Sequence, residues 1–466
     1  MTLANLFDGM IQLTSFAEIK VDFWTQLLLT CSTILDFDRI CLIDPSSLSL
    51  NLNAHFINRK IYWSTRAVYM KQKFVADLTT GDTKLEPSTK IAFLGESINP
   101  TTDRMKDLFD FRNKIKQMAY AKPQCETEPI TVIGMSCRMP DSCGVDEYWK
   151  TYLDGKSVIR PHPDGRWTTE QIGAMGNIRI ECGFVPCSVD EFDGDFFEMS
   201  PVECNFTDPQ QRSSTEVSWE ALEDAGINPQ SLAGSMTAIY SGCWTQDYND
   251  LIQKFAPPST GELRWYMGNS YAAGAARLAH IYKVRGPNLG VDVACSSSFV
   301  AVGQAVHDLR RGAANLAIAT TANLIIKPTY QNDVVLSKDS RCKTFDASAN
   351  GFARSEGVAA LILKRLSDAV RDGDRIHSII MGYGATQEGE TKSVGTPTVE
   401  MEALAMELSL RDAGMKPEQI QVVEAHGTGT AKGDPLEIKA ISKAYSASGR
   451  TDPLIITAGK ANIGHT

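Results

Sequence analysis

Short apolar runs alternate with amphipathic segments along the chain beyond residue 127. The runs are typical of buried strands that feed into turns: ITVIGMSC, AIYSG, LGVDVA, LAIATTANLII, VAALILK, IIMGYG, IQVVEAHG and PLIITAG. Segments with helical spacing, such as SSTEVSWEALEDAG and MEALAMELSLRDAG, separate them and end at Gly226 and Gly414, where helix-ending glycines belong. This alternation predicts an α/β domain whose sheets are covered by helices.

The chain before residue 127 has a different texture. Residues 1–101 mix apolar and polar stretches without a repeat or a motif that points to chemistry, so they carry no assignment. In residues 102–121, apolar side chains recur three to four positions apart, which predicts an amphipathic helix. The polar stretch KPQCETEP follows, so we interpret residues 102–126 as a helix and linker that resembles a docking segment.

Composition and charge exclude some classes of function. Of the 466 residues, 43% are hydrophobic and 22% charged, which is ordinary for a soluble globular protein. The net charge of -10 and the absence of a Lys/Arg-rich block argue against nucleic acid as a partner. The N-terminus does not resemble a signal peptide, and no apolar stretch is long enough to span a bilayer. We therefore expect a cytoplasmic protein that does not insert into membranes.

The cysteines indicate a reducing environment and no metal site. There are 11 of them, an odd number, and no CxxC pair occurs. Cys137 and Cys143, and likewise Cys182 and Cys187, are too far apart for zinc-knuckle spacing. Most of these thiols are expected to be small buried hydrophobic groups.

Cys295 is the cysteine with the most informative surroundings. It lies between the strand-like LGVDVA and the helix-like SSSFVAVGQAVHDLRR, on the turn before a helix N-terminus. Backbone N–H groups and the helix dipole at such a position favour the thiolate and can stabilise an oxyanion. This setting alone does not decide between a nucleophile and an inert buried thiol.

Two histidines follow strand-like runs in the same way. His426 lies in VVEAHGTGTAKGDPLE and His465 in TAGKANIGHT, each just beyond a strand. Such turns bring polar side chains to the rim of an α/β sheet, so Cys295, His426 and His465 can converge on one cleft. The other five histidines are interpreted as structural groups: His55, His162, His280, His307 and His377.

No cofactor motif is present. The glycines of GYGATQEG lack dinucleotide-binding spacing, and GTGTAKGD lacks the Lys-Ser/Thr ending of a P-loop. There is also no GxSxG elbow for an acyltransferase or thioesterase. A protein of this kind would need other proteins to load and carry its substrates.

Three motifs, in the right order, resemble those of β-ketoacyl synthases. VDVACSSS is similar to the nucleophile motif, EAHGTGTAKGDPLE to the first histidine motif, and KANIGHT to the lysine and second-histidine motif. EPITVIGMSCRMP, FFEMSPVECNFTDPQQRSSTEVSWEALEDAGI, YAAGAARLAHIYKVRGP and RCKTFDASANGFARSEG match as well. The resemblance covers residues 127–466 and is closest to ketosynthase domains of polyketide synthases and animal-type fatty acid synthases.

The resemblance implies a thiolase-like layered αβαβα fold, working as a homodimer. Residues 127–375 would form its N-terminal half and residues 376–466 its C-terminal half. Cys295 would accept an acyl group from the 4'-phosphopantetheine of an acyl carrier protein, and no cofactor would be tightly bound. His426 and His465 would stabilise the enolate formed when a malonyl-type thioester loses carbon dioxide. An acyltransferase would load the acyl groups onto the carrier protein.

Three further residues match family positions that support this site. Lys460 matches the lysine that orders the two histidines. Asp434 and Glu437 match the acidic pair after the first histidine, where they would hold the loop and balance Lys460.

The sequence departs from the family pattern in several places. It ends at Thr466, directly after the second histidine, so we expect a C-terminally truncated second half and poor stability of this chain alone. The segment NLIIKPTYQNDVVLSKDSR is about four residues shorter than its family equivalent. Val293 stands where Thr is common and Asn350 where Asp is common, which could reshape the acyl pocket.

Two other functions are alternatives to condensation. A truncated, non-catalytic ketosynthase-like protein would only bind a carrier or a dimerisation partner. A cysteine hydrolase would use Cys295 and one histidine, but this leaves Lys460, the second histidine and DPQQR unexplained. The starter unit, extender unit and product, and the choice between fatty acid and polyketide synthesis, do not follow from these motifs.

Overall fold

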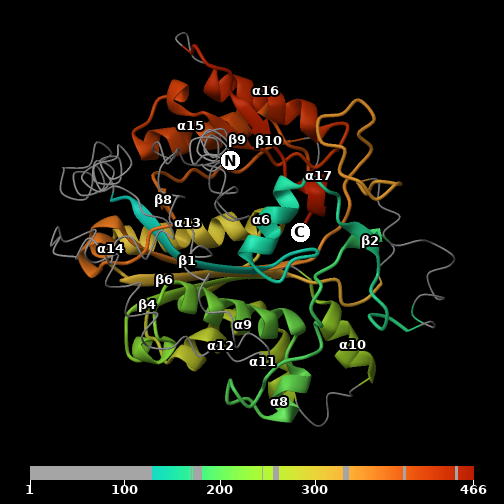
Figure 1. The fold of residues 1–466 in the computed structure, drawn as a ribbon, viewed down its shortest axis with the longest axis vertical. Helices are drawn as coiled ribbons and strands as arrows, with labels where there is room; N and C mark the ends of the chain where they lie inside the picture. The colour runs from blue at the N-terminus through green and yellow to red at the C-terminus, as the bar shows by residue number, and fades with distance from the viewer. Residues whose placement is uncertain are drawn as a thin grey trace, which may run out of the picture.

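The computed structural model describes residues 128–168, 171, 181–243, 245–255, 262–328, 335–391, 395–446 and 450–466. The unassigned segment 1–101 and the helix and linker expected over 102–126 lie outside the described residues. The described residues form stacked layers of helices and sheets (Figure 1).

The larger sheet has six strands in the order β5, β4, β6, β7, β1, β8. Strand β4 is parallel to β5 and β6, whereas β7 is antiparallel to β6 and β1, and β8 is antiparallel to β1. Each strand lies in an apolar run that predicted one. The bounds are Ile130–Arg138 for β1, Thr237–Cys243 for β4, Asn288–Val291 for β5, Leu316–Asn323 for β6, Gly357–Arg365 for β7 and Ser378–Ile380 for β8.

Helices cover both faces of this sheet, which explains why its strands are continuously apolar. Successive side chains of a strand point to opposite faces. In β7, Leu361 belongs to the hydrophobic cluster under α13 (Ser297–Arg310). Its neighbour Ile362 belongs to the cluster under α9 (Pro209–Asp224) and α12 (Tyr271–Tyr282). Both faces therefore need apolar residues.

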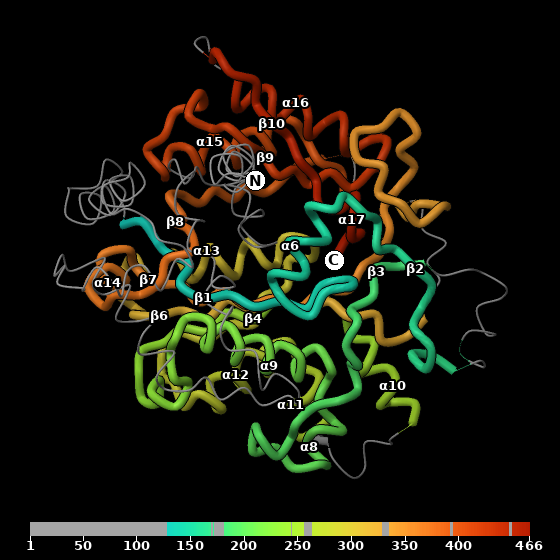
Figure 2. The backbone as a smooth tube through the Cα atoms, viewed as in Figure 1, coloured from blue at the N-terminus to red at the C-terminus, as the bar shows by residue number. Residues whose placement is uncertain are grey.

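A second, smaller sheet lies on the other side of α13 (Figures 1 and 2). It pairs β9 (Val422–Glu424) with β10 (Ile455–Thr457) in parallel. Helices α15 (Val399–Ala413) and α16 (Gly433–Tyr445) share one hydrophobic cluster with these strands. The layers therefore run from α9 and α12 through the large sheet, α13 and the small sheet to α15 and α16. This order confirms the expected αβαβα arrangement.

Shorter elements complete the described part of the chain. Strands β2 and β3 form an antiparallel pair. The bounds are Val145–Leu153 for α6, Ile159–Pro161 for β2, Glu181–Gly183 for β3, Pro201–Phe206 for α8, Asp247–Phe255 for α10, Glu262–Asn269 for α11, Leu366–Asp372 for α14 and Lys460–Ile463 for α17. As predicted, Gly226 and Gly414 end α9 and α15 in the left-handed conformation, with φ of 69° and 65°.

A buried ion pair just before the start of β7 joins three other segments of the chain. The Glu356 side chain is fully buried and accepts hydrogen bonds from Arg166 Nη1 at 2.7 Å and Nη2 at 3.2 Å. It also accepts from the backbone N–H groups of Val185 at 3.0 Å and Ile325 at 2.9 Å. Burial raises the pKa of Glu356, and Arg166 is the main group that opposes the rise. The four bonds satisfy a carboxylate that water cannot reach.

The contact between α13 and the second half of the chain gives a testable prediction. A Cβ atom on Gly303 would lie 2.6 Å from Cε1 of Tyr383, which is too close for van der Waals contact. We expect Gly303→Ala to lower the free energy of unfolding by about 1–3 kcal/mol, because overpacking outweighs the higher helix propensity of alanine. Urea denaturation measures this difference.

Gly395→Ala is the control. No atom lies within 4 Å of a Cβ placed at Gly395, so its free energy of unfolding should change by no more than about 0.5 kcal/mol. Equal losses in the two variants would contradict the proposed overlap with Tyr383.

Candidate active site

Cys295 lies on a sharp turn between β5 and α13. It is the middle residue of a 3-10 turn, Ala294–Ser296, that leads directly into the helix. Ala294 has a φ of 52°, a left-handed conformation that is strained for a residue with a side chain. The Val293 N–H donates to Ser297 Oγ at 2.9 Å, and this hydroxyl donates to the Ala294 carbonyl at 2.8 Å. The turn thus presents an exposed thiol at the N-terminus of α13.

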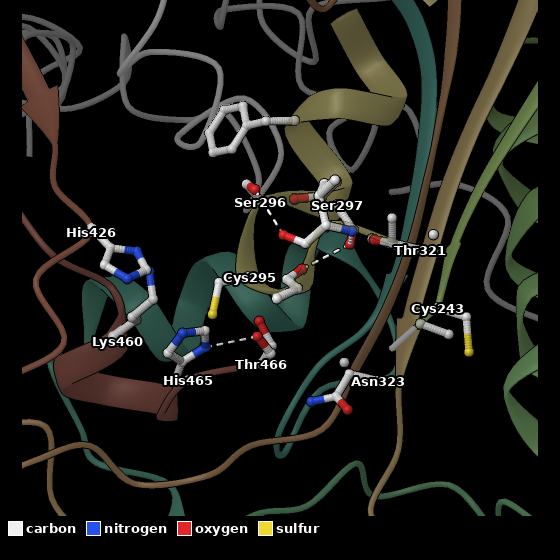
Figure 3. A pocket seen from close by; sticks show the side chains of 18 of the residues that line it. Cys243, Cys295, Ser296, Ser297, Thr321, Asn323, His426, Lys460, His465 and Thr466 are labelled. Atoms are coloured by element: carbon white, nitrogen blue, oxygen red, sulfur yellow. Dashed lines mark hydrogen bonds between the residues drawn. The ribbon is translucent and has the colours of Figure 1, made fainter. Parts of the chain in front are cut away.

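A pocket of about 450 Å³ opens in front of this thiol. Cys295, His426, Lys460 and His465 all line it. Figure 3 shows Cys295 pointing from the α13 side toward His465, with Lys460 and His426 beyond. The structure therefore brings together four of the six predicted site residues, which come from three separate parts of the sequence.

The other two predicted residues hold the loop that carries His426. Glu437, near the start of α16, accepts from the backbone N–H groups of His426 at 2.5 Å and Gly427 at 2.8 Å. Asp434 accepts from Gly429 at 3.0 Å and Thr430 at 3.2 Å. Neither acid lines the pocket. Their position fits a structural part in fixing the loop between β9 and α16.

His465 is fixed by its backbone. Its N–H donates to the Ala353 carbonyl at 2.7 Å, and its own carbonyl accepts from Ser355 at 2.8 Å. The imidazole Nδ1 lies 2.8 Å from the Thr466 carbonyl oxygen, so this bond requires the proton on Nδ1. The ring centroid is 5.4 Å from that of His426, and the two rings are perpendicular. Two imidazoles therefore face the pocket in one fixed arrangement.

Both imidazoles are neutral at pH 7. Burial lowers the pKa of His465 to about 4, and the positive charge of Lys460 adds to this effect. Burial, again with Lys460, lowers the pKa of His426 well below its ordinary value. A neutral imidazole has one N–H donor and one lone pair, so each ring can donate a hydrogen bond without carrying charge.

The pKa of Cys295 shifts in the opposite direction to the one expected from its turn, which was expected to favour the thiolate. The walls of the pocket remove part of its hydration, and this desolvation raises its pKa. Lys460 and a backbone hydrogen bond lower the pKa, but the net direction is upward. The resting side chain is therefore the thiol, because partial burial outweighs the nearby charge.

Lys460 influences the site through its positive charge, which shifts the pKa values of nearby groups. In the part of the chain that the structure describes, no carboxylate forms an ion pair with its ammonium group. Burial raises the pKa of Glu424 and Glu437, and Lys460 is among the groups that oppose this rise. Its charge therefore balances two buried acids at a distance while keeping both imidazoles neutral.

Sequence reasoning missed Glu424, the last residue of β9. This buried carboxylate accepts from the Gly459 N–H at 2.6 Å, from the Thr457 hydroxyl and from Tyr152 Oη at 3.3 Å. Gly459 immediately precedes α17, which begins with Lys460. Glu424 thus connects the strand before His426 to the helix before His465. The sequence did offer one sign of this residue, because Glu424 is an acid within the otherwise apolar run IQVVEAHG.

The two noted substitutions have different surroundings. Val293 lines the pocket next to the Cys295 turn, so it can influence what the pocket accepts. Asn350 lies outside the pocket and accepts a hydrogen bond from Ser337 Oγ at 2.9 Å. The shortened segment before Arg341 includes residues 329–334, which lie outside the described residues.

The described ranges show neither a metal cluster nor a membrane-spanning helix. Within those ranges, no group of three or more His, Cys, Asp or Glu side chains is arranged to hold a metal ion. Among the helices of the same ranges, none is long and apolar enough to cross a bilayer.

The sequence matches the Beta-ketoacyl synthase N-terminal domain over residues 127–369 and the C-terminal domain over residues 377–466. One of the phenolphthiocerol/phthiocerol polyketide synthase proteins of Mycobacterium tuberculosis is 36% identical over 376 residues, which is 78% of this chain and 24% of that protein. Another protein of the same synthase is 37% identical over 380 residues, 78% of this chain and 17% of that protein. The chain therefore spans about a quarter or less of these curated relatives.

Solved ketosynthases share the fold. The ketosynthase from module 6 of the bacillaene synthase of Bacillus subtilis 168 is 33% identical with a TM-score of 0.66, covering 73% of this chain and 58% of that one. Ketosynthase twelve from the bacillaene polyketide synthase of Bacillus amyloliquefaciens is 30% identical with a TM-score of 0.64, covering 72% and 59%. These matches confirm the thiolase-like fold. The chain belongs to the β-ketoacyl synthase family.

Proposed function

We propose that this chain catalyses the decarboxylative condensation of an acyl thioester with a malonyl-type thioester. The observation that carries the proposal is the pocket that Cys295 lines together with two neutral imidazoles, those of His426 and His465. A nucleophile at a helix N-terminus and two neutral donors supply what this reaction needs: a covalent acyl carrier and stabilisation of an enolate.

In the first half-reaction, the Cys295 sulfur attacks the carbonyl carbon of an acyl thioester. The bond to the thiol of the carrier breaks, and that thiol leaves with the proton that Cys295 gives up. Because the resting side chain is a thiol, this proton must leave as the sulfur attacks. Lys460, which lowers the thiol pKa, favours this step. The product is an acyl-Cys295 enzyme.

In the second half-reaction, a malonyl-type thioester loses carbon dioxide. The electron pair of the broken carbon–carbon bond moves into the thioester, and His426 and His465 donate hydrogen bonds to the enolate oxygen. Donation from His465 Nε2 requires the tautomer that already carries its proton on Nε2, and in that tautomer Nδ1 does not donate to Thr466. The enolate carbon attacks the acyl carbonyl, the bond to Cys295 breaks, and the thiolate takes up a proton.

The substrates and partners of this proposal follow the family. The thioesters would be carried on the 4'-phosphopantetheine of an acyl carrier protein that an acyltransferase loads, in the cytoplasm, for polyketide or fatty acid synthesis. In a homodimer, the edge strand β5 would pair with β5 of a second copy of the chain. Leu289 in this strand is 48% exposed, and Val293 just beyond it is 45% exposed. Such apolar exposure on an unpaired strand edge favours association with another strand.

We also propose the division of the chain into halves at 127–375 and 376–466, after a linker at 102–126. Strand β8, at the start of the second half, pairs with β1 at the start of the first, so the halves share a sheet edge. Their separate expression is therefore not expected to yield two folded proteins.

Acylation of Cys295 tests the proposed nucleophile. A short acyl-thioester incubated with the folded chain should add one acyl group to the peptide that contains Cys295, as seen by mass spectrometry. Cys295→Ala should abolish this adduct. Cys143→Ser, which removes another exposed thiol outside the pocket, should leave it unchanged. A folded wild-type chain that stays unmodified would favour the non-catalytic alternative.

The histidines should separate the two half-reactions. His426→Ala should leave acylation of Cys295 largely intact but slow decarboxylation of malonyl carrier by about 10²–10³-fold, because one donor to the enolate is lost. Release of labelled carbon dioxide measures the second step and mass spectrometry the first. Equal losses in both steps would assign His426 to thiol activation instead.

The lowered histidine pKa makes folding depend on pH. The pKa of His465 is about 4 in the folded chain against an ordinary value of 6.5. Its neutral form therefore contributes fully to stability above about pH 6.5, and this contribution is lost as the pH falls toward 4. We expect the free energy of unfolding, measured in urea from pH 7 to 4.5, to fall less steeply in His465→Gln than in the wild type. Parallel curves would contradict this.

A further inference from the structure

One wall of the pocket is formed by the face of the large sheet that α13 covers further along. On this face, β6 presents Ala317 and Ala319 to the hydrophobic cluster under α13, and then Thr321 and Asn323 to the pocket. Alternate side chains of a strand point to the same face, so these four residues form one row. The row changes from apolar to polar where it passes from the helix to the pocket.

Small residues flank the polar end of this row. Gly242 of β4 and Ala359 of β7 are the partners of Thr321 on the neighbouring strands, and both line the pocket. Asn323 pairs in the same way with Gly357, which also lines the pocket. These neighbouring positions carry no large side chain, so the wall leaves room for an acyl chain over Thr321.

Thr321 also lies close to the turn that carries Cys295. A Cβ atom on Gly242 would be 2.5 Å from Cγ2 of Thr321 and 3.3 Å from Cβ of Ser297. The side chains of Thr321 and Ser297 therefore flank the same point above Gly242, and the Ser297 hydroxyl is the group that holds the turn. Figure 3 shows Thr321 on the side of Cys295 away from His426. An acyl group on the Cys295 sulfur thus has Thr321 on one side and the imidazoles on the other.

The hydroxyl of Thr321 is free for a ligand. Within the described residues it forms no hydrogen bond, whereas the hydroxyl of its neighbour Thr320 donates to the Ala359 carbonyl at 2.9 Å. The amide of Asn323 is held in place, because its Nδ2 donates to the Ser355 carbonyl at 3.0 Å. A threonine hydroxyl can both donate and accept. An apolar chain that covers it displaces water and offers no partner in return, which is unfavourable.

We propose that Thr321 selects short acyl groups with a hydroxyl on the third carbon, that is, 3-hydroxyacyl groups. The inference rests on the proposed acylation of Cys295. The third carbon lies two bonds beyond the carbonyl carbon that is bound to sulfur, which suits a hydroxyl positioned next to the Cys295 turn. The substrate hydroxyl replaces water on the Thr321 hydroxyl, so neither group is left unpaired. A saturated chain of the same length leaves the Thr321 hydroxyl without a partner.

Acylation of Cys295 by matched thioesters tests the proposal in the full chain. N-acetylcysteamine thioesters of butyrate and of each 3-hydroxybutyrate enantiomer are supplied singly, and mass spectrometry of the Cys295 peptide follows each rate. We expect one enantiomer to react about 3–10-fold faster than butyrate and than its mirror image, which has the same intrinsic reactivity. Absence of acylation by all three overturns the proposed function and this inference with it. Equal rates overturn this inference alone.

Two variants of Thr321 separate its hydroxyl from its shape. Thr321→Val keeps a methyl group against Gly242 but loses the hydroxyl, so the rate ratio of the favoured enantiomer to butyrate should fall to about one. Thr321→Ser keeps the hydroxyl and should retain the ratio. Ser298→Ala removes another hydroxyl from the pocket wall and should also retain it. The proposal is wrong if Thr321→Val keeps the preference or if Ser298→Ala removes it.

Discussion

The packing of α13 between the large sheet and the second half of the chain is the constraint on which the rest of the structure depends. The helix presents apolar residues such as Ala305 and Leu309 to the large sheet, and its Gly303 lies against the Tyr383 ring of the second half. The helix cannot shift without disturbing both contacts, and its N-terminus therefore stays at one place at the rim. Cys295 sits at that end, so the position of the thiol is set by the packing of the whole core rather than by its own loop.

Buried carboxylates fix the other side of the pocket. Glu437 holds the backbone at His426, and Glu424 holds the backbone just before Lys460. These acids lie outside the pocket, yet they place the groups that face it. The desolvation that lowers the pKa of both imidazoles comes from the same dense packing, helped by Lys460. The same packing thus sets both the position and the protonation state of His426 and His465. This suits two hydrogen-bond donors that must stay neutral before the enolate forms.

The alternation of apolar and helical segments predicted the α/β class, and three motifs predicted which residues would meet. These predictions succeeded because the ends of strands and the glycine turns after them can be recognised from the neighbouring residues alone. The part played by Glu424 was not predictable, since an acid in an apolar run does not reveal its partners Thr457 and Gly459. The direction of the Cys295 pKa was also hidden, because it depends on segments, such as the one that carries Lys460, that become neighbours of Cys295 only in the folded chain.

The turn at Ala294 has a consequence for the three serines that follow Cys295. Ser297 accepts from Val293 and donates to Ala294, which compensates for the strained backbone beside the nucleophile. Ser296 donates instead to the Val293 carbonyl at 2.9 Å, and neither serine forms a side-chain cap for α13. The serines in this run therefore have distinct roles, although the run looks like simple repetition. Substitutions should be tolerated unequally along it. A change at Ser297 removes the hydrogen bonds that hold the Ala294–Ser296 turn, whereas Ser296 can vary while the Cys295 thiol keeps its place.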